Sequence, residues 1–249
     1  MEEIKIGESG GAGILEAMFT AGAHYGHTRS RRHPSVAAFI FGKKNASEII
    51  NLEGTRVSLE RAEEFLEELG KARKQLLMVG NKPEARMVLR KEAERLGVPY
   101  VSARWIGGTI TNFEEIKKRL AKLEDLRAKR SSGDLDVYTK RERGVIDKEI
   151  GDLERKFSGL LTLKGLPGAL IVVDSRAEEI AVLEARARKI PVVSISSSNC
   201  DISKIDYPIV ANDSSSSSIT FFIGRLADAY KRGKGKVEST RDSEDSLEA

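Results

Sequence analysis

The sequence predicts a three-layer α/β fold, in which helices cover both faces of a parallel sheet. Short apolar segments such as residues 169–173 alternate with amphipathic helical patterns, which is typical of parallel strands joined by helices. These segments are apolar throughout, as expected for strands that are buried on both faces. Residues 113–160 interrupt this alternation of strands and helices with two helical patterns, each of which has a narrow apolar seam. They predict an inserted antiparallel helical hairpin of the coiled-coil type.

The elements of the first half follow from apolar periodicity and from the positions of glycine and proline. A short helix ends at Gly22, and Pro83 and Gly97 mark the start and the end of a later helix. The elements expected between and after them are strands at 39–41 and 49–52, a helix at 55–73, and strands at 75–79 and 98–103.

The second half begins with the hairpin and then returns to the strand–helix rhythm. Its first helix is predicted from Phe113 to Arg130, and a capping box of Thr139 and Glu142 starts the second. The elements expected afterwards are strands at 169–173, 190–195 and 207–210, a helix at 177–189 with Ile180, Leu183 and Ala187 facing inward, and a helix at 219–230.

These elements divide the chain into four parts. A polar, acidic C-terminus cannot bury enough apolar surface to fold, so we expect it to be disordered. The parts are a flexible N-terminal arm (1–11), one α/β domain (12–112 and 161–232), the inserted hairpin (113–160) and the disordered tail (233–249).

The composition excludes several classes of protein. Lysine and arginine number 42 against 38 aspartate and glutamate residues, and this net charge of +4 is too small to identify a partner by itself. A single cysteine, Cys200, excludes a disulfide framework and a cysteine-rich zinc site and suits a reducing cytoplasm. No apolar run is long enough to span a membrane, and the N-terminus lacks the pattern of a secretory signal. We therefore expect a cytoplasmic protein without membrane contact.

A basic stretch between residues 29 and 44 has the charge pattern of a nucleic-acid-binding surface. It contains no acidic residue, whereas a solvated loop usually mixes both signs, and Phe39 and Phe41 lie within it. Its basic residues are Arg29, Arg31, Arg32, Lys43 and Lys44. The arginines are the first candidates, because arginine can bind a phosphate bidentately.

Further candidates for RNA contact lie in the hairpin and at its base. The first hairpin helix is rich in basic residues, including Lys117 and Lys118, but a solvated helix often is too, so both interpretations stay open. The segment SARWIGGTITNF links the strand at 98–103 to the hairpin, and two glycines allow close approach of its backbone. Its polar candidates and glycines are Arg104, Thr109, Thr111, Asn112, Gly107 and Gly108.

Trp105 is the large residue of this junction and has two interpretations. It either stacks on a base or a ribose, or it forms a hydrophobic pin between the sheet and the hairpin, with Phe113 as a second anchor. We favour the pin, because such a junction needs a large buried group. The junction has no acid, histidine or cysteine, which argues against a catalytic loop.

Metal sites and nucleophiles are weaker interpretations. His24 and His27 are three residues apart and could share a metal on a helix, but Gly26 and the nearby arginines favour a loop that repels cations. Cys200 has no histidine in its half of the chain to activate it, so we expect a small buried residue. We predict no catalytic residue, no metal and no cofactor.

One alternative function stays open at the carboxyl ends of the strands, where parallel α/β sheets bind ligands. Gly80 could hold a phosphate through backbone N–H groups at a helix start, and Asp174 and Asp201 could hold an ion. The alternative is therefore a cytosolic α/β enzyme or scaffold that binds a phosphorylated small ligand there.

Six stretches of the chain share a pattern with one known family: AGAHYGHTRSRRHP, FIFGKKNASEIINL, RWIGGTITNF, KGLPGALIVVD, IPVVSIS and SNCDISKIDYPIVAND. They resemble the S-two family of small-subunit ribosomal proteins in its bacterial form. They follow the family order across about residues 14–232, and RWIGGTITNF before a helical hairpin is the most specific of them. The resemblance implies a flavodoxin-like (Rossmann-like) sheet with an inserted coiled-coil hairpin.

The resemblance also implies a function. It implies a structural constituent of the small ribosomal subunit that binds small-subunit rRNA on the ribosome and supports translation. Implied partners are neighbouring small-subunit proteins and, in some bacteria, the mRNA-binding ribosomal protein S-one, with no homo-oligomer. The chain departs from the family at His33, where tryptophan is common, and after the IPVV strand. The second departure weakens a metal or partner site there more than it weakens rRNA binding.

Overall fold

The computed structural model describes residues 11–245. The N-terminal arm expected over residues 1–11 therefore lies, apart from Gly11, outside the described residues, as do residues 246–249. Over residues 11–245, none of the helices is both long and apolar enough to cross a membrane.

The central sheet consists of five parallel strands, which confirms the predicted parallel sheet. Its spatial order is β5-β4-β6-β7-β8. Numbered along the chain within this sheet, the order is 2-1-3-4-5, which is the strand order of flavodoxin-like sheets. The strands are β4 (Leu76–Val79), β5 (Tyr100–Val101), β6 (Ala169–Val173), β7 (Val192–Ser196) and β8 (Tyr207–Val210).

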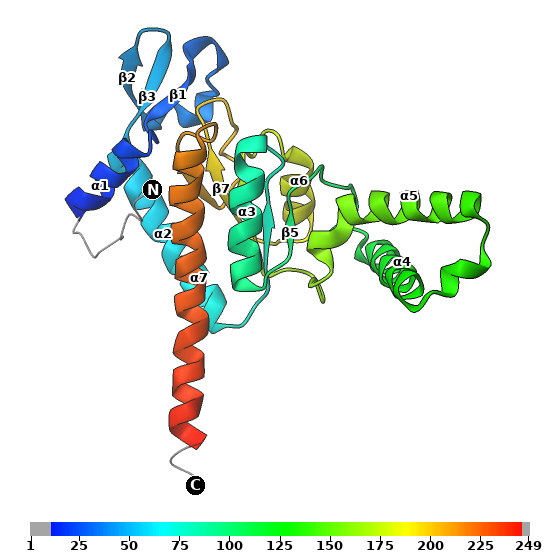
Figure 1. The fold of residues 1–249 in the computed structure, drawn as a ribbon. Helices are drawn as coiled ribbons and strands as arrows, with labels where there is room; N and C mark the ends of the chain where they lie inside the picture. Colours follow the sequence, from blue (N-terminus) through cyan, green and yellow to red (C-terminus); the bar gives the residue numbers. More distant parts are fainter. Residues whose placement is uncertain (1–10, 246–249) are drawn as a thin grey trace.

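Helices cover both faces of this sheet. The α-helices of the described residues are α1 (Gly11–Thr20), α2 (Leu52–Lys71), α3 (Pro83–Leu96), α4 (Phe113–Ser132), α5 (Lys140–Phe157), α6 (Glu179–Ala187) and α7 (Ser216–Asp245), of which α2, α3 and α7 cover one face and α6 lies on the other. Leu76 and Met78 of β4 point into a core formed with α2, α3 and α7, and α7 lies between the other two (Figure 1). Leu77 and Val79 point the other way, into a core formed with α6, the junction and the bases of α4 and α5.

A smaller antiparallel sheet holds the basic stretch. Its order is β1-β3-β2, with β1 (Tyr25–Thr28), β2 (Ile40–Lys44) and β3 (Ser47–Ile50). The two strands expected around the GKKNA turn are confirmed as β2 and β3. β1 lies where a loop was expected. Its sequence shows no alternation of apolar and polar residues. It forms because it pairs with β3, and such a tertiary contact cannot be predicted from periodicity.

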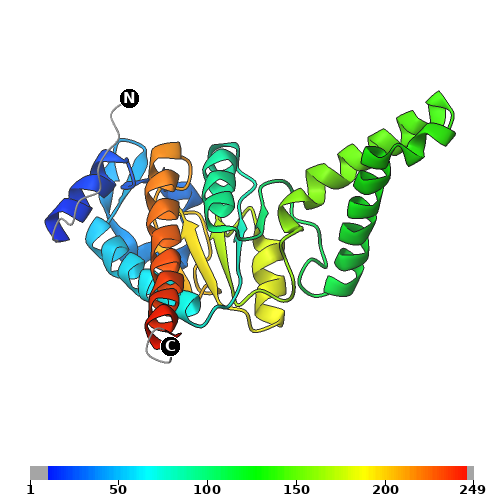
Figure 2. The same ribbon diagram turned by 60° about the horizontal axis from the view of Figure 1, so that its bottom comes forward.

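Helices α4 and α5 project together from the body of the protein (Figures 1 and 2). Leu120 and Leu123 of α4 and Ile150 and Leu153 of α5 are buried where the two helices and the body meet. Several ion pairs connect the helices, including Arg127–Glu154 at 2.8 Å, Arg130–Asp147 at 3.4 Å and Lys122–Glu149. Exposed pairs of this kind contribute about 0–1 kcal/mol each, so the apolar contacts hold the helices together.

The predicted capping box of α5 is confirmed. The Thr139 hydroxyl accepts a hydrogen bond from the backbone N–H of Glu142, and the Glu142 carboxylate accepts one from the backbone N–H of Thr139 at 2.9 Å. These reciprocal bonds satisfy two N–H groups that the first turn of a helix leaves free.

The chain leaves the body for α4 and returns from α5 at the same edge of the sheet. The junction follows β5 directly, and Gly159 after α5 lies against the backbone of Tyr100 in β5. A Cβ at residue 159 would overlap the carbonyl oxygen of Tyr100, so this close contact requires glycine.

The last helix is longer than expected. The apolar periodicity predicts a helix over residues 219–230, whereas α7 runs from Ser216 to Asp245 and includes residues 233–245 of the expected tail. Gly70 of α2 and Gly233 of α7 let these helices touch, since a Cβ at either position would collide with the backbone of the other helix.

Candidate nucleic-acid interface and strand-end cluster

Arg29 and Arg31 lie on the surface in a short 3-10 turn, η1 (Arg29–Arg31), directly after β1. Among the side chains that the structure describes, neither arginine has an acidic partner within ion-pair distance. A free guanidinium can bind a phosphate bidentately without first breaking an ion pair. These two residues are therefore well placed for the RNA contact that the sequence predicts.

Arg32 is half-buried and paired, unlike its neighbours. Its Nη1 lies 3.2 Å from Oε1 of Glu48, whose residue is only 2% exposed. The other oxygen of Glu48 has no hydrogen-bond partner within the described part of the chain. A buried carboxylate depends strongly on its one cation, so Arg32 stabilises the small sheet as well as adding positive charge.

Lys43 and Lys44 are exposed on β2, opposite Glu48 and Ser47 of β3. Side chains alternate along a strand, so the two lysines point to opposite faces of the small sheet. Phe41, on the same strand, is 80% exposed. The small sheet thus presents cations on both faces, with an exposed aromatic ring beside them.

A single carboxylate, that of Glu184 on α6, organises the junction. Its residue is 8% exposed. It accepts hydrogen bonds from Trp105 Nε1 (3.1 Å), Gly108 N (2.7 Å), Ile110 N (3.0 Å), Thr111 N (3.1 Å) and Thr111 Oγ1 (3.1 Å). Burial alone would raise the pKa of Glu184, but these N–H groups hold it below its ordinary value.

This network turns some predicted RNA-binding groups inward. Thr109 is 1% exposed and its hydroxyl donates to the carbonyl of Ile106 at 2.6 Å, while the Thr111 hydroxyl donates to Glu184. The two hydroxyls therefore face the protein, which differs from the expectation that they offer donors to RNA. Arg104 and Asn112 remain exposed.

The two large aromatic residues of the junction are buried, whereas its two glycines differ in conformation and surroundings. Trp105 is 5% exposed and Phe113 is 8% exposed, and both lie in the core that the sheet forms with α6 and the bases of α4 and α5. Gly108 has φ of +90°, a conformation that favours glycine, and Gly107 is exposed with open space beside it.

Lys117 and Lys118 are exposed at the base of α4 and paired with acids of the preceding turn. Lys117 lies 2.9 Å from Glu114 and over the ring of Phe113, and Lys118 lies 2.6 Å from Glu115. Such surface pairs are weak, so both lysines can exchange their partners for phosphate.

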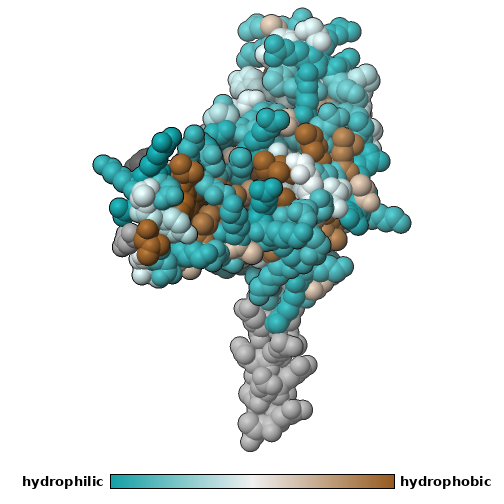
Figure 3. All heavy atoms as spheres, turned by 90° about the vertical axis from the view of Figure 1, so that its right-hand side faces the viewer, coloured by the Kyte–Doolittle hydropathy of each residue, from teal (hydrophilic) through white to brown (hydrophobic). Residues whose placement is uncertain are grey.

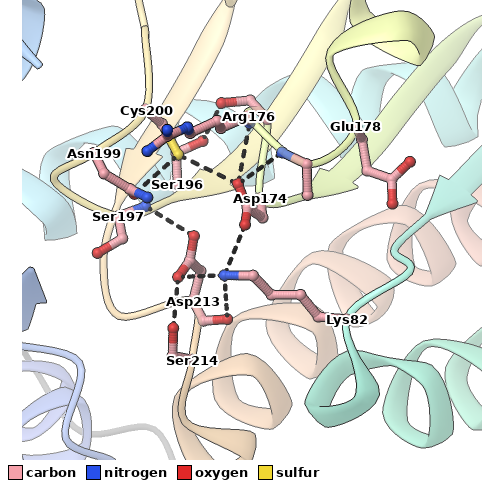
Figure 4. Close-up of polar contacts among 12 residues, drawn as sticks. Lys82, Asp174, Arg176, Glu178, Ser196, Ser197, Asn199, Cys200, Asp213 and Ser214 are labelled. Carbon is pink, nitrogen blue, oxygen red and sulfur yellow. Dashed lines mark hydrogen bonds and ion pairs between the residues drawn. The ribbon is translucent and has the colours of Figure 1, made fainter. Parts of the chain in front are cut away.

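A second polar cluster lies where the strands of the central sheet end (Figure 4). Lys82 precedes α3 and places its Nζ 2.7 Å from Oδ2 of Asp174 and 2.8 Å from Oδ1 of Asp213. Because Asp174 follows β6 and Asp213 lies between β8 and α7, one ammonium group connects loops after three strands. Asp174 also accepts the N–H groups of Arg176 and Ala177, which fixes the turn before α6.

The charges of this cluster are strongly coupled. Burial acts to lower the pKa of Lys82, but Asp213 and Asp174 raise it overall. Burial acts to raise the pKa of Asp174, but the hydrogen bond and the charge of Lys82 bring it below its ordinary value. Burial and the charge of Asp174 raise the pKa of Asp213. The opposite shifts of the two carboxyl groups arise because Lys82 stabilises the charge of Asp174, whereas Asp213 is more deeply buried and lies close to the charge of Asp174.

Glu178 and Cys200 border the cluster. Burial raises the pKa of Glu178 to about 7, although its carboxylate accepts the N–H of Asn81 at 2.9 Å. Burial and the charges of Asp174 and Asp213 raise the pKa of the Cys200 thiol to about 12. A buried thiol of this kind is not a nucleophile near neutral pH, which agrees with the expected small buried cysteine.

The residues that the sequence suggested as ligands at the strand ends do not form an open site. Asp174, Cys200 and Asp213 bring ligand-type atoms within 4.8 Å of one another, but the ammonium group of Lys82 lies between the two carboxylates. Asp201 instead bonds with Ser203. A Cβ at Gly80 would lie 2.9 Å from a methyl group of Leu89, so this glycine serves the close contact of β4 with α3.

His24 and His27 do not lie on a helix, so the helical spacing that suggested a shared metal does not apply. His24 precedes β1 and contacts two aromatic rings, and His27 lies within β1, where its backbone N–H donates to Ser198.

Comparison with known families adds to this geometry. Residues 18–233 match the family described as Ribosomal protein S2. The chain belongs to the ribosomal protein S2 family. One relative in the S2 family, from Endomicrobium trichonymphae, is 37% identical over 237 residues, which cover 94% of this chain and 97% of the relative. Another, from Chloroflexus aurantiacus, is 40% identical over 228 residues, which cover 92% of this chain and 96% of the relative. Both are named "Small ribosomal subunit protein uS2".

The face of this S2-family chain that carries α4 and α5 is mainly hydrophilic (Figure 3). Apolar residues form small, separate patches on it. A surface of this kind suits contact with a hydrated, charged partner better than a broad apolar interface.

Glu184 and Lys82 were not predicted, although Glu184 left a signal in the sequence. We expected Ile180, Leu183 and Ala187 to face inward, and this is wrong: the buried face of α6 contains Ala181, Val182, Glu184 and Ala185. The small alanines let α6 approach the sheet, and Glu184 stands at a core-facing position of the helix. A charged residue within a small-residue helix face is the signal that indicates a buried partner.

Proposed function

We propose that this chain is a structural constituent of the small ribosomal subunit that binds small-subunit rRNA through a basic surface. The basic surface consists of Arg29, Arg31, Lys43 and Lys44. The observation that supports it best is the exposure of these four cations without an acidic partner among the described side chains. Folded RNA is recognised largely through phosphate and ribose contacts, which such cations provide.

The projecting helices extend this proposal. We propose that α4 and α5 form a coiled-coil arm whose base adds Lys117 and Lys118 to the RNA contact. Arg104 and Asn112 lie exposed between the arm and the sheet, where they add donors. The burial of Trp105 and its bond to Glu184 support the pin role for this residue.

We propose neighbouring small-subunit proteins as further partners. Exposed apolar side chains support such contacts: Val137 and Val145 near the outer end of the arm are 86% and 65% exposed, and Ile180 on α6 is 54% exposed. Binding of the mRNA-binding protein S-one and a cytoplasmic location stay predictions of the family resemblance.

The alternative of an enzyme or ligand-binding scaffold loses support. Lys82 already connects the carboxylates at the strand ends, and Gly80 is engaged in packing against α3. The two relatives described above are named as ribosomal proteins.

Binding of the purified chain to small-subunit rRNA, measured over a range of salt concentrations, tests the proposal. The variant Arg29→Glu/Arg31→Glu should weaken binding at least about tenfold at low salt and reduce the slope of log K against log salt by about 2. Unfolding in urea should be unchanged, because neither arginine has an acidic partner among the described side chains.

Arg32 needs separate treatment. Arg32→Glu would leave Glu48 buried without its cation, so it should lower stability as well as affinity. The matched control is Arg61→Glu/Lys91→Glu, which makes the same charge change at two exposed helical positions. Equal losses for the control and for Arg29→Glu/Arg31→Glu would contradict a defined basic surface.

A further inference from the structure

Three aromatic rings meet where α1 leads into the small sheet. Figure 1 shows the backbone of this corner. The ring of Phe19 stacks on the imidazole of His24 with centroids 4.4 Å apart and planes within 9°. The imidazole in turn contacts the ring of Tyr25, with centroids 4.1 Å apart. Phe19 is 62% exposed and Tyr25 is 48% exposed, so large parts of both rings face solvent. We call Phe19, His24 and Tyr25 the aromatic corner.

The backbone beneath the aromatic corner is firmly held. Gly22, with φ of +72°, ends α1, and the N–H of Ala23 bonds to the carbonyl of Met18 at 3.0 Å. Met18 and Ala23 are fully buried. Asn212, after β8, bonds to the carbonyls of Gly22 and Ala23. Buried neighbours thus anchor the corner, and its exposed rings are not needed to fill the core.

The surroundings of the aromatic corner are positively charged. Tyr25 is opposite Ile49, and Ile49 is opposite Gly42, so these residues form one row across the small sheet. Lys44 lies two residues beyond Gly42 and therefore points to the same face. The register therefore places Lys44 on the face that carries Tyr25, and the charge of Lys44 acts together with burial to lower the pKa of His24.

Acidic groups are sparse on this face. No acidic residue stands between Glu16 and Glu48 in the sequence. Glu48 points away into the protein and pairs with Arg32, while Glu16 lies exposed on α1. A Cβ at Gly42 would meet no atom within 4 Å, so the surface beside the Tyr25 row is open.

We propose that the aromatic corner and Lys44 bind an unpaired nucleotide of RNA, whose base stacks on Tyr25 and whose phosphate contacts Lys44. The inference rests on the proposed function and specifies one contact within it. Stacking on a fixed aromatic ring accepts any base, because every base has a π face, and a nearby cation neutralises the backbone. The exposed ring and the positive charge of Lys44 on the same face favour RNA over an apolar protein segment.

The test uses the full chain and short RNAs. The probes are ten-nucleotide oligouridylate and oligoadenylate with 2-aminopurine at one position, together with intact small-subunit rRNA. Tyr25→Leu keeps the apolar bulk and removes the π face, and it should weaken oligonucleotide binding about tenfold and abolish 2-aminopurine quenching. Tyr25→Phe should bind within about twofold of the unaltered chain, since it keeps the ring. Lys44→Gln should weaken binding and reduce the slope of log K against log salt by about 1, the value expected for the loss of one phosphate contact.

The matched control is Tyr138→Leu, because Tyr138 is 47% exposed and lies at the far end of the arm. It should leave oligonucleotide binding unchanged. The inference is overturned if Tyr25→Leu binds as tightly as the unaltered chain, or if Tyr25→Phe loses as much as Tyr25→Leu. Loss of a protein neighbour from reconstituted subunits at unchanged RNA affinity would also overturn it, by assigning the corner to protein contact.

The two proposals fail separately. If the unaltered chain binds intact rRNA with salt dependence but does not quench 2-aminopurine in the oligonucleotides, only the stacking contact is refuted. If it binds neither RNA, the proposed function fails as well. Urea unfolding of each variant separates loss of binding from loss of folding, and Lys44→Gln provides an independent test at an exposed side chain.

Discussion

The indole nitrogen of Trp105 donates a hydrogen bond to Oε1 of Glu184 across 3.1 Å. This bond joins the base of the projecting helices to α6 on the face of the sheet. The same carboxylate accepts four further bonds from Gly108, Ile110 and Thr111. The conformation of the junction therefore depends on one buried charge as well as on apolar packing.

Glu184→Gln should lower the free energy of unfolding by about 2–4 kcal/mol, because the amide NH₂ group would face several N–H donors and leave them unsatisfied. Amide hydrogen exchange at Gly108, Ile110 and Thr111 should accelerate more than exchange in the sheet. Glu179→Gln, at an exposed position of the same helix, should change stability by at most about 0.5 kcal/mol. Similar effects of the two substitutions would show that the network does not hold the junction.

Trp105→Ala should destabilise the protein by about 3–5 kcal/mol, since it removes the largest buried ring of the junction. Trp105→Phe keeps most of the volume but loses the bond to Glu184, so about 1–2 kcal/mol is expected. Thermal unfolding and RNA affinity should be measured together. Unchanged stability with weakened RNA binding would assign Trp105 to base stacking instead of the pin role.

Lys82→Met should cost about 3–5 kcal/mol in stability, because Asp174 and Asp213 would remain buried without their cation. Urea unfolding measures this loss. Adding Asp174→Asn and Asp213→Asn to Lys82→Met should recover much of it by removing the unpaired charges. The control is Lys71→Met: Lys71 pairs with Glu68 at the surface, so the stability of this variant should stay close to that of the unaltered chain. If the triple variant is less stable than Lys82→Met, the cluster is not held by charge compensation.

Glu178 should make stability depend on pH. Its pKa is about 7 in the folded protein against an ordinary value of 4.5, so the folded state binds a proton between these values that the unfolded state releases. Stability is therefore lost as pH rises from 4.5 through 7, at up to about 1.4 kcal/mol per pH unit.

Glu178→Gln keeps an oxygen that can accept the N–H of Asn81 and removes the titrating group. Above pH 7 this variant should be more stable than the unaltered chain by about 2–3 kcal/mol, and the difference should vanish below pH 4.5. Urea unfolding at several pH values gives both curves. Parallel curves across this range would show that Glu178 does not titrate as described.

Periodicity and local signals predicted the regular elements of this fold well. The apolar runs of β6 and β8 fall at the expected residues, and the capping box at Thr139 starts α5 as expected. β1 was missed because its pairing with β3 is a tertiary contact, and α7 continues past Tyr230, where apolar periodicity ends.

The site was less predictable, because charge patterns do not reveal which groups meet in space. Arg29 and Arg32 look alike in the sequence, yet only Arg32 pairs with a buried acid. Lys82 and Asp213 are far apart along the chain, and the strand order of the sheet brings them together. The orientation of Thr109 and Thr111 depends on Glu184, which lies far from them in sequence.

The contact of Gly159 with Tyr100 brings the end of α5 back to the strand from which the chain leaves for α4, so the arm is an insertion at one point of the body. Its two connections meet the body at one short strand, so the length of the arm does not alter the geometry of the sheet. We therefore expect the fold to tolerate matched shortening or extension of the outer turns of α4 and α5, because the two connections would keep their places. The outer turns set how far the arm extends, and other parts of the sequence form the core of the body. The surface at the end of the arm can therefore vary without repacking the body.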